Sequence, residues 1–146
     1  MRFDHLGVVV SSLALGRSHL SALFGITQWT REFDDPINRV LVQFGSDSSG
    51  MCYEIIAPRG EESPVSKSLR SGNRILNHVA YLVPDLRAAG EVMAAQQCVA
   101  TAEPKPAIAY GGRKIQFYIS PLRFMVEFIE APEHRHDYLA SAAVPG

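Results

Sequence analysis

The sequence has little that would mark a disulfide-stapled or redox protein. Its 146 residues include only two cysteines, Cys52 and Cys98, and these lack the CxxC spacing of redox and metal-binding motifs. Two such cysteines are more often reduced, buried side chains than a disulfide bridge. A disulfide scaffold is therefore not expected, and a chain of this length can bury a core without one.

An excess of one charge and a long apolar run are also lacking. The formal net charge is −1, which gives no electrostatic reason to expect a nucleic acid or an anionic membrane as a partner. No run of roughly eighteen uncharged apolar residues occurs, and no basic segment precedes an apolar run near residue 1. We therefore expect a cytoplasmic protein without a membrane span or a signal peptide.

What the sequence does contain is a set of polar residues repeated at one offset. His78 follows His5 by 73 residues, and Glu127 follows Glu54 by the same 73 residues. A duplicated module of about seventy residues explains this offset, because the surrounding segments repeat with it and need no gap. The matching segments are 4–10 with 77–83, Leu13 with Leu86, 42–44 with 115–117, and 53–56 with 126–129.

Each copy of the module predicts a strand, a helix and three further strands. The first segment is apolar and β-branched, Ser11 and Ser12 offer N-caps for an amphipathic helix, and Gly25 can end that helix. The first copy is expected to have strands at 3–10, 26–31, 39–44 and 51–57 and a helix at 13–24. The second copy is expected to have strands at 76–83, 98–102, 114–119 and 124–129 and a helix from Pro84-Asp85 to about residue 97.

The polar segments between and after the copies set the expected boundaries. Residues 1–58 form the first βαβββ module and residues 74–131 the second. Residues 59–73 are rich in Ser, Gly and Pro and read as a linker, with one helical turn near 64–69. Residues 132–146 are expected to be a poorly ordered tail. The fold class is therefore α+β, with two tandem modules.

The four repeated polar residues lie in segments that otherwise read as core. Side chains alternate between the two faces of a strand, so Glu127 shares a face with Met125 and Ile129, and the other three also have apolar neighbours. A buried carboxylate is costly unless it is paired, and a divalent cation would compensate all four groups. Two imidazoles and two carboxylates suit Zn, Ni, Co, Mn or Fe. We therefore predict one divalent metal ion at His5, Glu54, His78 and Glu127.

Each of the four residues also has a simpler explanation. A single glutamate on a strand is usually exposed to solvent. A lone histidine beside apolar residues is more often a hydrogen-bonded structural group than a metal ligand. Four independent explanations of this kind would also have to reproduce one common offset, so the repeat favours the metal site.

Five segments are similar to the motifs of one known family. They are DHLG at 4–7, YEIIAP at 53–58, LNHVA at 76–80, GGRKIQF at 111–117 and VEFIE at 126–130. The sequence resembles the vicinal oxygen chelate superfamily, which includes glyoxalase I, methylmalonyl-CoA epimerase, extradiol dioxygenases and bleomycin-resistance proteins. The resemblance spans residues 1–131. It implies that the paired βαβββ modules form an open, cup-like mixed sheet around a metal.

The resemblance also implies chemistry next to a carbonyl group. A His, Glu, His, Glu set is most similar to the ligands of glyoxalase I, whereas epimerases often carry Gln at the second position. In both activities the metal polarises a substrate carbonyl and stabilises an enediolate or enolate while a carboxylate removes the neighbouring proton. By resemblance, Glu127 is the expected catalytic ligand that also transfers the proton, with Glu54 next.

One departure from the family weighs against an epimerase. The family places an acidic base that is not a metal ligand on the third strand of the first module, and residues 40–44 contain no acid. Gln43 and Gln116 repeat at the 73-residue offset and are expected to bind substrate, as are Tyr118 and Arg113. Exposure of both glutamines to solvent explains them equally well.

Three classes of function stay open on the sequence alone. The first is a divalent-metal-dependent lyase or isomerase that acts on a small carbonyl or thioester substrate. The second is a metal-free protein that sequesters a drug or small ligand in the cup. The third is a non-haem iron dioxygenase, which the second carboxylate disfavours.

Two expectations concern the surface of the protein. An open sheet with exposed edges favours pairing with a second copy, so a homodimer is expected. His134 and His136 lie in the charged tail and are expected to be exposed to solvent.

Overall fold

Ten strands form one mixed sheet in the computed structural model of the chain, which describes residues 1–72 and 76–140. The strand order is β2-β4-β5-β1-β6-β10-β9-β7, with β3 beside β4 and β8 beside β9. The elements before residue 73 are β1 (Arg2–Val9), α1 (Leu13–Phe24), β2 (Gln28–Trp29), β3 (Phe33–Asp35), β4 (Val40–Ser46), β5 (Cys52–Pro58) and α2 (Ser66–Ser71). Those after residue 75 are β6 (Leu76–Leu82), α3 (Leu86–Ala95), β7 (Val99–Ala100), β8 (Lys105–Pro106), η1 (Ile108–Tyr110), β9 (Lys114–Ile119) and β10 (Met125–Ile129).

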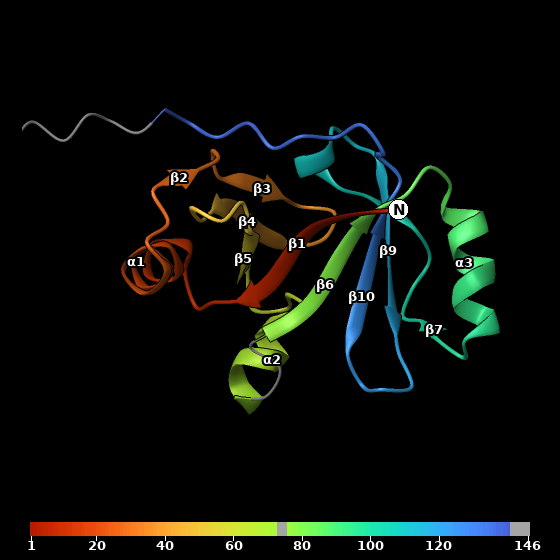
Figure 1. Cartoon of the computed structure of the whole chain (residues 1–146). Helices are drawn as coiled ribbons and strands as arrows, with labels where there is room; N and C mark the ends of the chain where they lie inside the picture. Colours follow the sequence, from red (N-terminus) through yellow and green to blue (C-terminus); the bar gives the residue numbers. More distant parts are fainter. Residues whose placement is uncertain (73–75, 141–146) are drawn as a thin grey trace, which may run out of the picture.

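The centre of the sheet repeats one arrangement twice. Strands β1 and β6 lie side by side and antiparallel, β5 runs parallel to β1, and β10 runs parallel to β6 (Figure 1). The corresponding segments of the two halves of the sequence therefore meet in the middle of one sheet. This arrangement confirms the predicted α+β class with an open, mixed sheet.

The two long helices begin and end where the sequence predicts. The hydroxyl of Ser12 accepts a hydrogen bond from the backbone N–H of Leu15, and Gly25 ends α1 at a φ of 66°, a left-handed conformation that glycine adopts without strain. The carboxylate of Asp85 accepts hydrogen bonds from the backbone N–H groups of Arg87 and Ala88 in the first turn of α3, which satisfies amide groups that have no partner within the helix.

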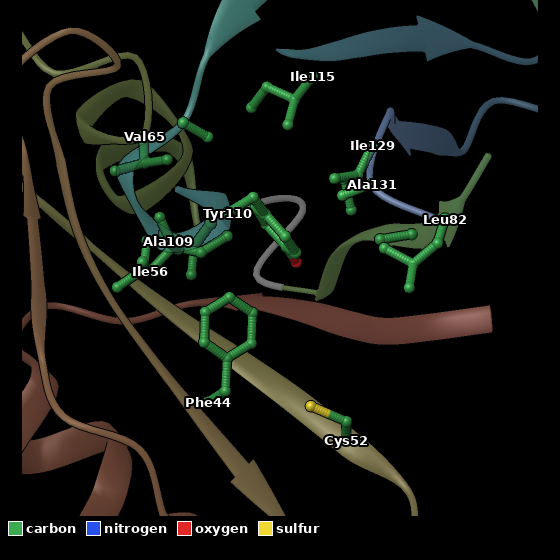
Figure 2. Packing of buried hydrophobic residues seen from close by; sticks show 14 residues of the cluster. Phe44, Cys52, Ile56, Val65, Leu82, Ala109, Tyr110, Ile115, Ile129 and Ala131 are labelled. Carbon is green, nitrogen blue, oxygen red and sulfur yellow. The ribbon is translucent and has the colours of Figure 1, made fainter. Parts of the chain in front are cut away.

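Packing divides the sheet into a face covered by helices and a face that forms a cup. Leu13 and Leu20 of α1 pack on Ile55 and Ala57, while a second cluster below α3 is built around Tyr118 and Phe128. The third cluster lines the inside of the cup, where Phe44 and Tyr110 meet edge to face (Figure 2). The cup is therefore a largely apolar space on the side away from α1 and α3, and Leu69 of α2 packs against its cluster.

The two halves of the cup are joined within one chain. The buried carboxylate of Asp35 accepts hydrogen bonds from the backbone N–H groups of Ile37, Asn38 and Ile108, and the side-chain amide of Asn38 donates to the carbonyl of Pro106. These contacts tie β3 to the segment that contains β8 and η1. One chain thus supplies both walls of the cup, and the expected homodimer stays a prediction.

The segment after Pro132 differs from the poorly ordered tail that the sequence predicts. Residues 132–140 run along the β2 side of the sheet (Figure 1), where Thr30 and Tyr138 form a β-bridge and the N–H of Leu139 donates to the carbonyl of Trp29. The expected exposure of His136 is wrong, because its side chain is only 8 % exposed. His134 is half-buried. Residues 141–146 of the predicted tail lie outside the described residues.

Two short strands and the 3-10 turn were not predicted from the sequence. Strands β3 and β8 and the η1 turn span two or three residues each, which is too short for a hydrophobic period to show. The expected linker contains α2, close to the predicted helical turn, and its predicted end at residue 73 lies outside the described residues. Within residues 1–72 and 76–140, no helix is long and apolar enough to cross a membrane.

Candidate metal centre

Four neighbouring strands place the repeated polar residues on the cup face. Glu54 on β5 lies opposite Gly7 of β1, which also lies opposite His78 of β6. Ala80 of β6 lies opposite both His5 of β1 and Glu127 of β10. Each carboxylate and imidazole therefore belongs to a different strand, and the structure brings all four together.

The donor atoms of these residues are close together and buried. The Nε2 atoms of His5 and His78 are 3.0 Å apart. Glu127 Oε2 lies 3.3 Å from His5 Nε2 and 2.9 Å from His78 Nε2, and Glu54 Oε1 lies 3.5 Å and 3.6 Å from the same two atoms. No side chain of the four is more than 9 % exposed.

The same distances fit a shared cation. Nitrogen and oxygen ligands bind zinc-like ions at about 2.0–2.2 Å, and two atoms that share such an ion lie about 2.8–3.6 Å apart. The Oε2 atom of Glu127 is also buried without a hydrogen bond. A buried polar atom without a partner is expected where a metal ion binds. The donor set and its spacing therefore fit a divalent metal ion.

A second layer of residues orients the two imidazoles. The Nδ1 atom of His5 lies 2.8 Å from Asp4 Oδ2, and that of His78 lies 2.9 Å from Asn77 Oδ1. Since both partners offer an oxygen, each Nδ1 carries the proton and donates it. Each Nε2 is then left to face the other donors, which is the tautomer that binds a metal. Asp4 and Asn77 are themselves separated by the 73-residue offset, so the repeat includes this second layer.

The charges of the cluster are strongly coupled. Burial by itself would lower the pKa of His5, but the charge of Glu54, the hydrogen bond to Asp4 and the adjacent carboxylate of Glu127 together raise it well above 6.5. Burial would raise the pKa of Glu127, and the adjacent imidazoles of His5 and His78 lower it to about 2. In the absence of metal the site therefore holds a proton on His5 and a charged Glu127.

The raised pKa of His5 predicts opposite effects of pH with and without metal. Folding makes His5 bind its proton more tightly, so the resulting stabilisation is complete below pH 6.5 and is lost as the pH rises through the raised pKa. We expect the Tm of the metal-free protein to fall over this range. The metal-loaded protein should gain stability, because the cation displaces that proton. Thermal melts from about pH 6 to pH 9 check both trends, and parallel curves would contradict them.

A cavity of about 670 Å³ opens above the four residues. Glu54, His78 and Glu127 line its floor, and apolar side chains such as Val42, Ile56 and Phe117 form its walls. Its size is that of a small-molecule site. Three cationic residues also line the cavity, and all three are exposed: Arg39, Lys67 and Lys105.

The structure separates the four residues that the sequence proposed for substrate binding. Gln116 borders the cavity, whereas Tyr118 packs below α3. Arg113 borders a smaller hollow beside Pro132. Gln43 lies on the helix-covered face, where its amide donates to the carbonyl of Thr30 at 2.7 Å and accepts from Arg17 at 2.6 Å. Of the four, only Gln116 borders this cavity, and its side-chain amide already accepts from the Tyr118 hydroxyl and donates to the carbonyl of Ala102.

Sequence reasoning missed two residues that contact Asp4, the hydrogen-bond partner of His5. Tyr110 and His136 both contact Asp4, at 2.6 Å and 2.9 Å. The one signal for Asp4 in the sequence was its match with Asn77 at the common offset. Tyr110 and His136 carry no such signal, because the residues at that offset are Ile37 and Ser63, which are of a different kind.

Comparison with known proteins agrees with the geometry. Residues 4–117 match the model of the Glyoxalase/Bleomycin resistance protein/Dioxygenase superfamily. No curated protein matches the sequence significantly.

Solved structures share the fold at low sequence identity. A hypothetical protein from Bacillus halodurans is 21% identical with a TM-score of 0.76, over 93% of this chain and 98% of that one. Methylmalonyl-CoA epimerase from Mycobacterium tuberculosis is 20% identical with a TM-score of 0.72, over 88% and 86%. A Streptomyces coelicolor methylmalonyl-CoA epimerase variant in complex with 2-nitronate-propionyl-CoA is 20% identical with a TM-score of 0.65, over 88% and 96%. By its sequence match, the chain belongs to the Glyoxalase/Bleomycin resistance protein/Dioxygenase superfamily.

Proposed function

We propose that this protein is a divalent-metal-dependent lyase or isomerase that removes a proton from the carbon next to a substrate carbonyl. The observation that carries the proposal is the set of four buried donors, which lie within 4.8 Å of one another beside a cavity of about 670 Å³. His5, Glu54, His78 and Glu127 would hold the ion. When bound, the ion would supply a Lewis acid that polarises the carbonyl.

The general base is proposed to be one of the two glutamates at the cavity floor. Four carboxylates line the cavity: Asp35, Glu54, Glu103 and Glu127. Asp35 is occupied by three backbone N–H groups and by the amide of Asn38, and Glu103 is exposed. Glu127 is the preferred candidate because its Oε2 atom has no hydrogen bond and can accept a proton.

The lack of an acid on the cup face of β4 supports the choice of a glutamate at the cavity floor as the base. Val40 and Val42 of β4 line the cavity, and Gln43 points to the other face. The acid that the family carries on this strand thus has no counterpart on the cup face of β4. The observation favours a reaction of the glyoxalase type, in which a metal ligand moves the proton, over the epimerase reaction.

The cavity favours a partly apolar substrate with a negatively charged group. Its walls are largely apolar, while Arg39, Lys67 and Lys105 form no ion pair with any residue in the described part of the chain. Methylmalonyl-CoA and 2-nitronate-propionyl-CoA occupy two of the similar epimerase structures. We therefore propose a carbonyl compound or thioester with an anionic group as the substrate.

Metal loading and two assays test the proposal. The purified protein should gain thermal stability on addition of Ni, Co, Zn or Mn and lose it again with a chelator. The loaded protein is then assayed against methylglyoxal hemithioacetal and methylmalonyl-CoA side by side. The missing acid on β4 predicts the higher rate with the hemithioacetal.

The same experiment decides between the classes of function. A protein that binds none of these metals and keeps its thermal stability unchanged would be a metal-free binding protein instead. Metal binding without any proton exchange on either substrate would leave the proposed reaction type wrong while preserving the site. Activity that appears only with Fe and consumes oxygen would indicate a dioxygenase.

A further inference from the structure

The carboxylate of Asp4 is held by three donors from three parts of the chain. It lies 2.8 Å from His5 Nδ1 within β1, 2.6 Å from the Tyr110 hydroxyl of η1, and 2.9 Å from Nε2 of His136 in the C-terminal segment. Asp4 is 8 % exposed and Tyr110 is 4 % exposed. The cluster contacts the Nδ1 side of the His5 ring, whereas the other three proposed ligands lie beside its Nε2 atom.

An ionised carboxylate can only accept hydrogen bonds, so each of the three groups donates to Asp4. Burial by itself would raise the pKa of Asp4, but the hydrogen bonds from His136 and His5 and their charges keep it far below its ordinary value. The hydroxyl of Tyr110 remains protonated, because burial raises its pKa. Asp4 is thus a fixed, charged acceptor for the imidazole of His5.

We propose that Tyr110 and His136 are positioning residues of the metal centre, which fix Asp4 and through it the ring of His5. The inference rests on the proposed function, because it takes His5 to be a ligand. Neither residue contacts the donor atoms of Glu54, His78 or Glu127. His136 acts on His5 through Asp4, and the Tyr110 hydroxyl also lies 3.1 Å from His5 Nδ1 itself.

Only His5 needs such positioning residues, because the residues that hold the two imidazoles differ in charge. His78 is held by Asn77, whose neutral amide can be buried at lower cost than a carboxylate. Asp4, at the corresponding position of the first module, carries a charge that must be compensated. The structure supplies the compensation from η1 in the second module and from the C-terminal segment.

The C-terminal segment is built to hold His136 in place. The guanidinium of Arg2 donates to the carbonyls of Pro132 and His134 at 3.1 Å and 2.7 Å. The ring of His136 stacks on Phe44, with centroids 4.2 Å apart and planes 26° apart. The segment that reads as a loose tail therefore forms part of the wall behind the site.

Four variants separate positioning from simple packing. His136→Phe keeps the stacked ring and removes the donor, whereas His136→Gln restores an N–H donor without the ring. Tyr110→Phe removes only the hydroxyl. Tyr138→Phe is the matched control. Tyr138 lies in the same C-terminal segment as His136, but its hydroxyl donates to Cys52 Sγ on β5 instead of contacting Asp4.

Titration with Co²⁺, followed by its visible absorption spectrum, is the main readout. Outer-shell partners of this kind are worth about 10- to 100-fold in metal affinity. We expect losses in this range, with an altered spectrum, for His136→Phe and Tyr110→Phe. His136→Gln should regain most of the affinity, and Tyr138→Phe should bind as the wild type does. Wild-type affinity and spectrum in both donor-deletion variants would overturn the proposal.

A readout on the metal-free protein keeps this result distinct from the proposed function. In NMR spectra the ring of His5 should show a hydrogen-bonded Nδ1–H that shifts in His136→Phe and Tyr110→Phe but not in Tyr138→Phe. If the wild type bound no Co²⁺ while these shifts appeared, the proposed function would fail and the positioning role would stand. Unchanged signals in both variants would refute the positioning role whatever the metal binding.

Discussion

Glu127→Gln is expected to lower the rate of proton exchange at the substrate carbon by about 10²- to 10⁴-fold, the usual effect of removing a general base. Glutamine has nearly the same size and can be buried without a charge, so the fold should be preserved. The buried Oε2 atom of Glu127, which has no hydrogen bond, is lost as a proton acceptor. The measurement is solvent deuterium exchange into substrate at saturating metal.

Saturating metal is needed because the same substitution also removes a charged ligand. Glu54→Gln gives the comparison within the site, and Glu91→Gln gives a control for the chemical change on the exposed face of α3, where Glu91 pairs with Arg87. Undiminished exchange in the metal-loaded Glu127→Gln protein would contradict the assignment. If Glu54→Gln alone removed exchange, the base would be Glu54.

Gly7→Ala is expected to weaken metal binding on the order of 100-fold, although the substitution adds only one methyl group. A Cβ atom at residue 7 would overlap the imidazole of His78 and lie 2.6 Å from its Nε2 atom. Gly7 lies on β1 directly opposite both His78 and Glu54, so the ring must turn away from the other donors. Isothermal titration with Zn²⁺ or Ni²⁺ measures the loss.

The matched control is Gly90→Ala in α3, where the new Cβ would meet only the hydroxyl of Tyr118 on the helix-covered face. This variant should bind metal with wild-type affinity. Circular dichroism should show both variants folded, because the Gly7 substitution affects one ring at the floor of an open cavity. Equal metal affinity of Gly7→Ala and the wild type would mean that His78 is not a ligand.

Sequence reasoning succeeded where a pattern repeats along the chain. In the strands that carry His5, Glu54, His78 and Glu127, successive side chains alternate between the two faces of the sheet. The two long helices begin at their own N-cap residues, Ser12 and Asp85. Local periodicity and capping therefore located these elements to within one or two residues. The prediction that Gln43 binds substrate failed. The alternation of side chains shows which residues share a face of the sheet, but it does not show which face the helices cover.

The sequence by itself determined the duplicated modules and the four residues that come together, since duplication preserves each donor on its own strand. The tertiary structure alone decided what surrounds them. Asp4 meets Tyr110 at a separation of 106 residues and His136 at a separation of 132 residues, and such contacts follow from the closure of the sheet and the path of the last segment. No local period encodes a contact of this kind, because its free energy is gained only when distant segments pack together.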